Sequence, residues 1–215
     1  MFTFASHQRP LPLASRVLAA LFLLLWFPIY WRTWGPQNFF YLCDVALILG
    51  CLGLAFRNVL LISSSALSIS LISLFWTLDV LSHVLFGRTL FGGTDYMFDP
   101  QYPLWLRLIS LFHVVLPIVL FWALTRTGYD RRSFRFQCLV AAVALLASRA
   151  CGPAYNLNYA FTNPFTRRPI GPAPIHLAVT FLAIALILFL PVHMALRKSF
   201  APPMLNASPA PSPHP

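Results

Sequence analysis

Long apolar stretches alternate with short polar segments along most of the chain, a pattern that is typical of membrane-spanning helices. A helix that crosses a bilayer needs about 20 mostly apolar residues, and six stretches approach this length. They are residues 15–34, 38–56, 58–81, 102–124, 134–151 and 174–196. The pattern predicts an all-α fold, a polytopic membrane bundle of six transmembrane helices.

The apolar pattern stops short of both ends of the chain. We expect a cytoplasmic N-terminal segment at 1–14 and a six-helix transmembrane domain at 15–198. Residues 199–215 are rich in Pro, Ala and Ser and cannot bury a core, which predicts a disordered tail. The first stretch resembles a signal peptide, but no A-x-A cleavage pattern follows it. We therefore expect a retained signal-anchor helix.

The composition supports a membrane protein. Of the 215 residues, 59% are hydrophobic and 9% are charged, with a mean hydropathy of +0.73, whereas about a quarter of the residues in soluble domains are charged. The net charge of +10 would suggest a nucleic-acid partner in a soluble protein, but no run of basic residues exceeds two. We expect no nucleic acid and instead loop arginines that set the topology and meet lipid headgroups.

Six spans place both termini on one side of the membrane, so the basic residues can be counted by side. Nine lie on the side of the termini: Arg9, Arg16, Arg57, Arg126, Arg131, Arg132, Arg135, Arg197 and Lys198. Six lie on the other side: Arg32, Arg88, Arg107, Arg149, Arg167 and Arg168. The positive-inside rule then predicts that both termini are cytoplasmic. We expect a multi-pass protein of a bacterial inner membrane.

The third stretch is rich in serine, with hydroxyls at Ser63, Ser64, Ser65, Ser68, Ser70 and Ser73. Small hydroxylated residues let helices approach closely in lipid, where no aqueous hydrophobic effect drives them together. None of these serines lies in a nucleophile elbow such as G-x-S-x-G. We expect them to serve helix packing rather than catalysis.

The costly polar groups concentrate in one half of the predicted bundle. An ionisable side chain in the membrane core costs at least about 2.5 kcal/mol, so each needs a partner or a role. At a rise of about 1.5 Å per residue, Cys43, Asp79 and His113 fall in the half of the spans that lies away from the termini. Arg149 and the following loop with YNLNYAF belong to the same half. Inverting the protein moves all of them together, so the convergence does not depend on orientation.

Two histidines in this half stand in different local contexts. Asp79 and His83 are four residues apart and share a helix face, so the carboxylate can orient the imidazole or balance its charge. The same pair could equally be structural and satisfy itself at the interface. His113 has no polar residue within one turn except Ser110, which favours a functional role.

The four cysteines, Cys43, Cys51, Cys138 and Cys151, show no C-x-x-C spacing and predict free thiols. A buried thiol alone usually serves packing. For Cys43 a histidine could approach from another helix, and a thiolate stabilised by an imidazole is a nucleophile. Asp44 projects about 100° away from Cys43 on a helix. We expect Asp44 to pair with Arg149 or Arg107, or to accept hydrogen bonds from a neighbouring helix.

The segments FFYLCDVALILG, SLFHVVLPIVL and YNLNYAF together resemble the YwaF-like integral membrane proteins. They are more distantly similar to the androgen-induced membrane hydrolases of fatty-acid esters of hydroxy fatty acids. The resemblance covers scattered patches between residues 38 and 161. It implies a bundle of six or seven helices that acts on lipid acyl esters, with a nucleophile in the second span and a histidine in a later one.

The resemblance also implies roles for individual residues. The hydrolases have Thr where this chain has Cys43, and a related group of membrane acyltransferases has Cys, so hydrolysis and acyl transfer both stay open. The family histidine before V-L-P corresponds to His113. Asn156, Asn158 and Tyr159 correspond to an N-x-N-Y patch that would position the substrate carbonyl or headgroup.

The leading hypothesis is a membrane-embedded lipid acyl hydrolase or acyltransferase that needs no cofactor. Cys43 would attack an ester carbonyl, His113 would act as general base and then general acid, and Asn158 or a backbone N–H would stabilise the oxyanion. Asp79 and His83 would support the site. Three arginines are candidates for contact with a lipid headgroup, or for ordinary interfacial anchoring: Arg149, Arg167 and Arg168.

Two alternatives remain open at the level of sequence. A ceramidase-like hydrolase would use a zinc site built from Asp79, His83, His113 and His176, although no compact ligand motif such as H-E-x-x-H occurs. A small transporter, a lipid-binding protein or an assembly partner would use Asp44, Asp79 and Arg149 as a polar path.

Overall fold

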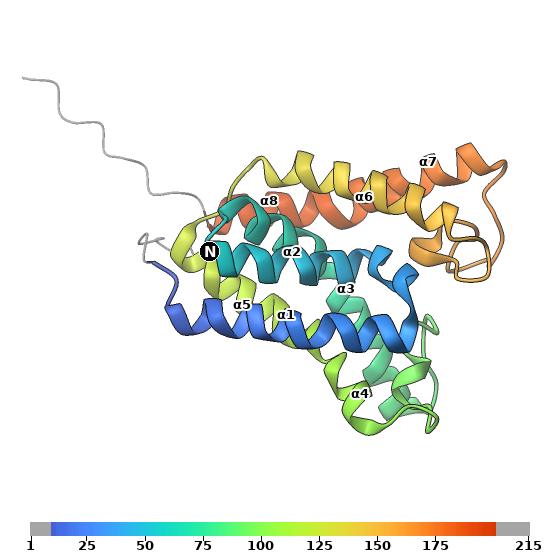
Figure 1. The fold of residues 1–215 in the computed structure, drawn as a ribbon. Helices are drawn as coiled ribbons and strands as arrows, with labels where there is room; N and C mark the ends of the chain where they lie inside the picture. The colour runs from blue at the N-terminus through green and yellow to red at the C-terminus, as the bar shows by residue number, and fades with distance from the viewer. Residues whose placement is uncertain (1–9, 201–215) are drawn as a thin grey trace, which may run out of the picture.

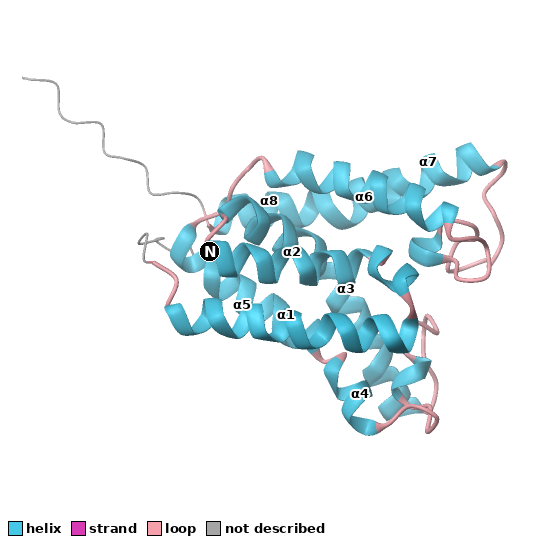
Figure 2. Cartoon of the chain, viewed as in Figure 1, coloured by secondary structure: helices cyan, strands magenta, loops and turns pink. Residues whose placement is uncertain are grey.

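The computed structural model describes residues 10–200, and this part of the chain is all-helical, with no strand (Figures 1 and 2). The α-helices are α1 (Leu13–Trp34), α2 (Leu42–Phe56), α3 (Val59–Phe86), α4 (Leu104–Ile109), α5 (Phe112–Thr127), α6 (Ser133–Ala150), α7 (Ala173–Ala183) and α8 (Leu190–Ser199). Between them lie the 3₁₀ helices η1 (Pro36–Phe40), η2 (Asp95–Met97) and η3 (Leu157–Tyr159), and the π-helical segment η4 (Ile184–Phe189).

Five helical stretches are long and apolar enough to cross a membrane. They are Leu13–Trp34, Val59–Phe86, Leu104–Thr127, Ser133–Ala150 and Ala173–Ser199. The helix α2 is apolar but only 15 residues long, because η1 takes up the start of the predicted stretch at 38–56. The prediction of an all-helical, multi-pass integral membrane protein is confirmed, with five clear spans and one shorter helix.

The helices lie roughly side by side and run between two ends of the molecule (Figure 1). The helix α1 begins and α8 finishes at the same end, on the left in Figure 1, which we call the terminal end. The connections at 87–103 and 151–172 lie at the opposite end, which we call the loop end. The helix α2 packs on both α1 and α3, and α3 also packs on α5 and α6. The predicted tail at 199–215 lies outside the described residues from residue 201 onward.

The helices α2 and α3 pack closely on each other through small side chains. An added Cβ at Gly53 would lie 2.8 Å from the backbone nitrogen of Ile62, and one at Gly50 would lie 2.7 Å from Ser65 Oγ. The Ser65 hydroxyl donates to the carbonyl of Ala46. The predicted packing role of the third-span serines therefore holds at this contact, where serine and glycine let two backbones approach.

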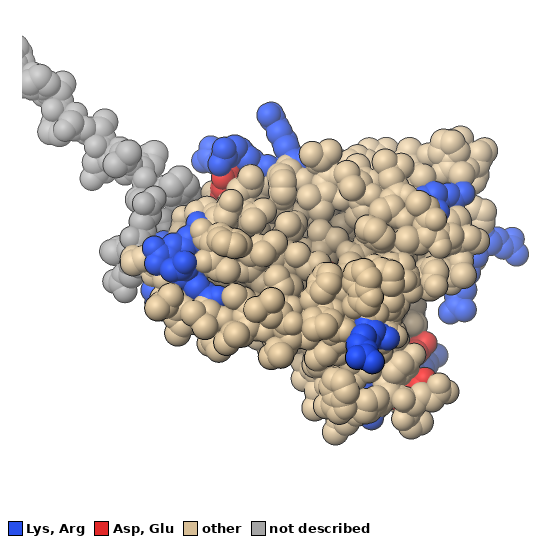
Figure 3. All heavy atoms as spheres, viewed as in Figure 1, with Lys and Arg blue, Asp and Glu red and all other residues tan. Residues whose placement is uncertain are grey.

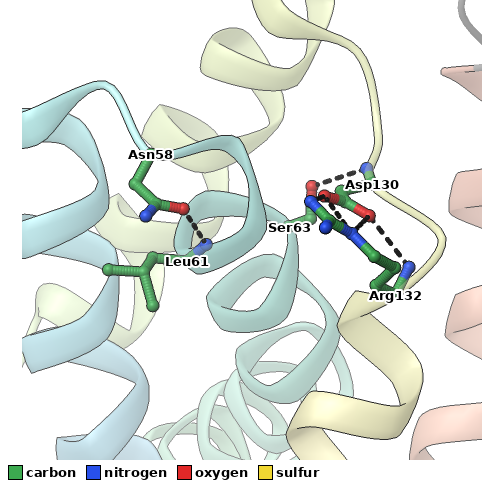
Figure 4. A network of polar contacts seen from close by, with 5 residues as sticks. All are labelled: Asn58, Leu61, Ser63, Asp130 and Arg132. Carbon is green, nitrogen blue, oxygen red and sulfur yellow. Dashed lines mark hydrogen bonds and ion pairs between the residues drawn. The ribbon is translucent and has the colours of Figure 1, made fainter.

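Polar groups fasten the turns at the terminal end (Figure 4). Asn58 caps α3 by accepting a hydrogen bond from the Leu61 N–H at 3.1 Å. In the turn between α5 and α6, the Asp130 N–H donates to Ser63 Oγ at 3.0 Å, and Arg132 forms a 2.7 Å ion pair with the Asp130 carboxylate. The turn after α5 is thereby attached to the first turns of α3.

Two interruptions shape the later spans. The predicted helix at 102–124 breaks at Ser110, where i→i+3 hydrogen bonds replace the α-helical pattern between α4 and α5. The last span widens to a π-helix at Ile184–Phe189, just before Pro191. Proline lacks an N–H and its ring clashes with the carbonyl four residues earlier, so a π-helical turn accommodates it. Such bulges recur at functional sites.

Charged side chains gather towards the two ends of the molecule, with a broad uncharged band between them (Figure 3). Among residues 10–200, large apolar side chains on the helices are exposed, with Leu24 at 69%, Leu85 at 69% and Leu146 at 64%. Exposed apolar side chains on neighbouring membrane-length helices suit contact with lipid tails.

Candidate functional site

A cavity of about 510 Å³ opens at the loop end of the bundle. Its walls come from the end of α1, from η1 and the start of α2, from α3 at Trp76, from the 87–103 connection, from the break between α4 and α5, and from the η3 loop and η4. Segments that are far apart in the chain thus enclose one space. Five of the residues predicted for the site lie on it: Cys43, His113, Asn156, Asn158 and Tyr159.

His113 is fixed by the break that precedes α5. Its Nδ1 lies 2.9 Å from the carbonyl oxygen of Ser110. A carbonyl oxygen can only accept, so Nδ1 carries the proton in the neutral ring and Nε2 carries the lone pair. The ring is buried between two aromatic rings, with centroids 4.7 Å from Trp76 and 4.1 Å from Phe112. His113 therefore presents a basic nitrogen beside the cavity.

Cys43 is half-buried in the first turn of α2 and lines the same cavity. Its Sγ lies 3.9 Å from Asp44 Oδ1, so the two side chains are in contact although they start about 100° apart on the helix. Within residues 10–200 no hydrogen bond joins Cys43 to His113. All four cysteines are free thiols, as predicted.

Asp44 is 2% exposed, and its predicted arginine partners bond elsewhere. Its Oδ2 accepts from Asn38 Nδ2 at 2.5 Å. The Arg107 guanidinium donates to the carbonyl of Met97 at 2.9 Å. Arg149 donates to the carbonyl of Ala160 at 3.0 Å. The two guanidinium groups that were expected to pair with Asp44 therefore donate to loop carbonyls instead.

Asn158 joins three elements rather than presenting a free amide to the cavity. Its Oδ1 accepts from the Leu42 N–H at 3.0 Å, the first N–H of α2. Its Nδ2 donates to the carbonyl of Phe40 at 2.7 Å and to Ser148 Oγ on α6 at 2.9 Å. Both polar groups are engaged, so the predicted oxyanion role of Asn158 is not supported. It positions the turn that carries Cys43.

Asn156 and His176 hold the rest of the same loop. Asn156 Nδ2 donates to the Thr162 carbonyl and hydroxyl, and its Oδ1 accepts from the backbone of Phe161 and Thr162. His176 Nδ1 accepts from the Ile170 N–H at 3.0 Å, so its Nε2 carries the proton and donates to the carbonyl of Tyr159 at 2.9 Å. Tyr159 stays partly exposed at the cavity, in a left-handed conformation with φ of 58°.

Asp79 and His83 do not interact as the spacing suggested. The Asp79 carboxylate accepts from the backbone of Leu90 and Phe91 at 2.6 and 2.7 Å, and from Thr94 Oγ1 at 2.7 Å. His83 instead stacks on a phenylalanine of the connection, with ring centroids 3.7 Å apart. Three hydrogen bonds from a loop satisfy the buried carboxylate better than one imidazole can. Asp79 thereby holds the connection that forms one wall of the cavity.

The predicted zinc ligands are not brought together. Among residues 10–200 no group of three or more His, Cys, Asp or Glu side chains is arranged to hold a metal ion. Asp79 and both ring nitrogens of His176 are already engaged in loop contacts. His83 is not on the cavity that His113 lines. The structure therefore gives no support to a zinc site built from these four residues.

The candidate headgroup arginines differ in their surroundings. Arg149 lies 4.0 Å over the ring of Phe161 and donates to a loop carbonyl, so it holds the loop in place. Arg167 and Arg168 are exposed in the connection before α7. Neither forms an ion pair within the described residues, which leaves both side chains accessible to a headgroup at the loop end.

Aromatic residues that were not among those predicted for the site complete the cavity. Tyr30 bonds Ser110 Oγ at 2.8 Å through its hydroxyl, and Trp76 donates to Tyr96 Oη at 3.2 Å. Burial raises the pKa of Tyr96 to about 12, so this phenol stays protonated at neutral pH. Trp76 lies three residues before Asp79, on the same helix face. The spacing of three residues from Asp79 is the feature of the sequence that could have placed Trp76 at the site.

Comparisons of the chain with family models, with curated proteins and with solved structures give no match. The resemblance to the YwaF-like proteins therefore stays a prediction.

Proposed function

We propose that the protein is a membrane-embedded acyl hydrolase or acyltransferase that acts on lipid esters, with Cys43 as nucleophile and His113 as general base. One observation carries the proposal: a free thiol and an imidazole with an unprotonated Nε2 line the same cavity. The resemblance to membrane lipid-ester hydrolases and acyltransferases favours the same chemistry. The loop-end position and the apolar band favour an amphiphilic substrate that keeps its tail in the membrane.

The reaction follows from these two groups. His113 Nε2 takes the thiol proton, and the Cys43 sulfur forms a bond to the ester carbonyl carbon. The tetrahedral intermediate collapses with cleavage of the carbon–oxygen bond, and the imidazolium returns its proton to the leaving alcohol. Water, or the hydroxyl of a second lipid, then gives its proton to His113 and attacks the thioester. The products are a fatty acid or a new ester, together with the restored thiol.

Ester turnover by the purified protein tests the proposal. We expect Cys43→Ala and His113→Gln each to lower the rate of release of alcohol from a medium-chain acyl ester at least a hundredfold, because each removes one chemical role. Cys138→Ala and His193→Gln are matched controls, since neither residue lines the cavity. Turnover that survives both cavity substitutions would exclude the proposal.

A second candidate function is a lipid-binding protein without chemistry. The specific observation in its favour is that Cys43 Sγ lies 3.9 Å from Asp44 Oδ1, while no hydrogen bond within residues 10–200 joins the thiol to an imidazole. In that case the cavity would hold a headgroup, and Cys43→Ala would leave lipid binding intact with no turnover in any variant. Detection of turnover separates the two functions.

The location of the site is part of the proposal. We place both termini in the cytoplasm of a bacterium and the cavity on the outer side of its inner membrane, in line with the nine-to-six distribution of basic residues. Arg167 and Arg168 would then meet headgroups of the outer leaflet.

A further inference from the structure

The carboxylate of Asp44 is buried beside the cavity, and no residue in the described range 10–200 gives it a basic partner. Its neighbours are Asn38 Nδ2 at 2.5 Å and Cys43 Sγ at 3.9 Å. Within residues 10–200 the only ion pair is the distant Arg132–Asp130 pair. An unpaired carboxylate at membrane depth is costly and marks sites for a substrate or an ion, so the position calls for a positive charge that the described chain does not supply.

The cavity that Asp44 lines is built largely from aromatic rings. Described residues contribute five tyrosines and two tryptophans to its walls, and no lysine or arginine. Six of these aromatic residues are Tyr30, Trp34, Tyr41, Trp76, Tyr96 and Tyr159. The negative face of an aromatic ring attracts a cation, and tryptophan is the strongest of the three ring types. Rings on several sides together with one carboxylate form a surrounding that favours organic cations and disfavours anions.

We propose that this cavity recognises a quaternary ammonium group, with Asp44 as its counter-charge and the aromatic rings as its walls. The inference rests on the proposed function in one respect: the ammonium is taken to belong to the alcohol part of the acyl ester. A trimethylammonium group has no N–H to donate and is bound through its charge and its methyl surface, which fits rings better than amides or hydroxyls. A phosphate would place a second negative charge near Asp44 with no lining cation to offset it, which favours a choline ester without phosphate.

Calorimetric titration of the purified protein tests this recognition, in bilayer discs of phosphatidylglycerol, which contain no choline. The probes are choline and butyrylcholine, with 3,3-dimethylbutanol and its butyrate as uncharged analogues of the same shape. We expect the charged probes to bind at least tenfold more tightly than the uncharged ones. Equal affinity for both sets would overturn the proposal. Glycerophosphocholine distinguishes the source, because binding as tight as that of choline would assign the group to a phospholipid headgroup.

Substitutions locate the counter-charge. Asp44→Asn keeps the shape and removes the charge, and we expect it to weaken choline binding at least tenfold. Asp99→Asn makes the same charge change outside the cavity and is expected to leave binding unchanged. Undiminished binding by a folded Asp44→Asn variant would overturn the assignment.

Two further measurements keep the inference separate from the proposed chemistry. Cys43→Ala is expected to bind butyrylcholine as the natural chain does while losing turnover, so failure of the catalytic claim would leave cation binding measurable. If Asp44→Asn does not fold, protection of Cys43 from a maleimide reagent in the natural chain replaces it. Choline should slow the labelling and 3,3-dimethylbutanol should not. Equal labelling rates would count against the cation site.

Discussion

The hydrogen bond on one ring nitrogen determines what the other nitrogen of a buried histidine can do. At His176 a backbone N–H occupies Nδ1, so Nε2 must donate, and the ring connects two parts of one loop. At His113 a carbonyl occupies Nδ1, so Nε2 is left as an acceptor beside the cavity. The first histidine is structural by this criterion, and the second is available as a base.

Asn158 provides the first test at the scale of single residues. Asn158→Ala removes the acceptor for the Leu42 N–H and the donors for Phe40 and Ser148. We expect it to lower the free energy of unfolding by about 1–2 kcal/mol, as the loss of a helix cap does, and to reduce reactivity at Cys43 because the start of α2 loses its support. Thermal unfolding in detergent measures the stability.

Asn163→Ala is the matched control for that substitution. Among the described residues its side chain bonds only members of its own loop, so its effect on unfolding should be small. Equal losses for Asn158→Ala and Asn163→Ala would contradict the role of Asn158 in holding α2.

The sequence predicted which residues share a depth, but not their partners. The rise of an α-helix was enough to put Cys43 and His113 in the same half of the bundle. The partner of His113 is a carbonyl exposed by a break in the helix, and Asn158 reaches α2 from a left-handed backbone conformation with φ of 50°. Neither the break nor the left-handed turn has a periodic signature, so these contacts could not be predicted from spacing.

The contact between α2 and α3 is the clearest test at the scale of elements. Gly53→Ala places a Cβ 2.8 Å from the backbone nitrogen of Ile62, and a backbone atom in a helix cannot move aside locally. We expect a loss of about 1–3 kcal/mol in stability from overpacking. Gly93→Ala is the control, because an added Cβ there meets nothing within 4 Å. A stable Gly53→Ala variant would show that the two helices separate more easily than their packing indicates.

The turn between α5 and α6 predicts a pH effect. The hydrogen bonds from Arg132 lower the pKa of Asp130. A carboxyl group with a lowered pKa stabilises the folded state above its unfolded pKa, and this contribution disappears as the pH falls through the lowered value. We expect Asp130→Asn to unfold at a lower temperature than the natural chain at pH 7.

The difference in unfolding temperature between Asp130→Asn and the natural chain should shrink in acid. It should also shrink with added salt, since the ion pair is on the surface. Thermal unfolding between pH 7 and pH 2 measures it. A difference in unfolding temperature that is constant with pH would exclude the electrostatic explanation.

Apolar length predicted the helices far better than it predicted their interruptions. Five long stretches became membrane-length helices, while the predicted helix at 38–56 lost its first residues to a 3₁₀ helix and the one at 102–124 is interrupted at Ser110. Those interruptions lie in η1 and at Ser110, and both lie on the cavity. A hydropathy pattern records only burial in lipid, so it does not reveal where a helix opens to make room for a ligand.

At the scale of the whole molecule, the charge distribution predicts an orientation. With cytoplasmic termini, the turn at 128–132 faces the cytoplasm and the connection at 151–172 faces outward. In a chain whose natural cysteines are replaced, we expect Thr166→Cys to react with a membrane-impermeant maleimide in intact cells. Arg131→Cys should react only after lysis. The reverse pattern would place the cavity on the cytoplasmic side and contradict the orientation.

The central claim is that Cys43 carries an acyl group during turnover. The most direct measurement is peptide mass spectrometry of the protein quenched in acid during reaction with a medium-chain ester. We predict an acyl thioester on the peptide that contains Cys43. It should be removable by hydroxylamine and absent from the His113→Gln variant. Ester turnover without any acyl mass on Cys43, or with the acyl group on another residue, would contradict the account.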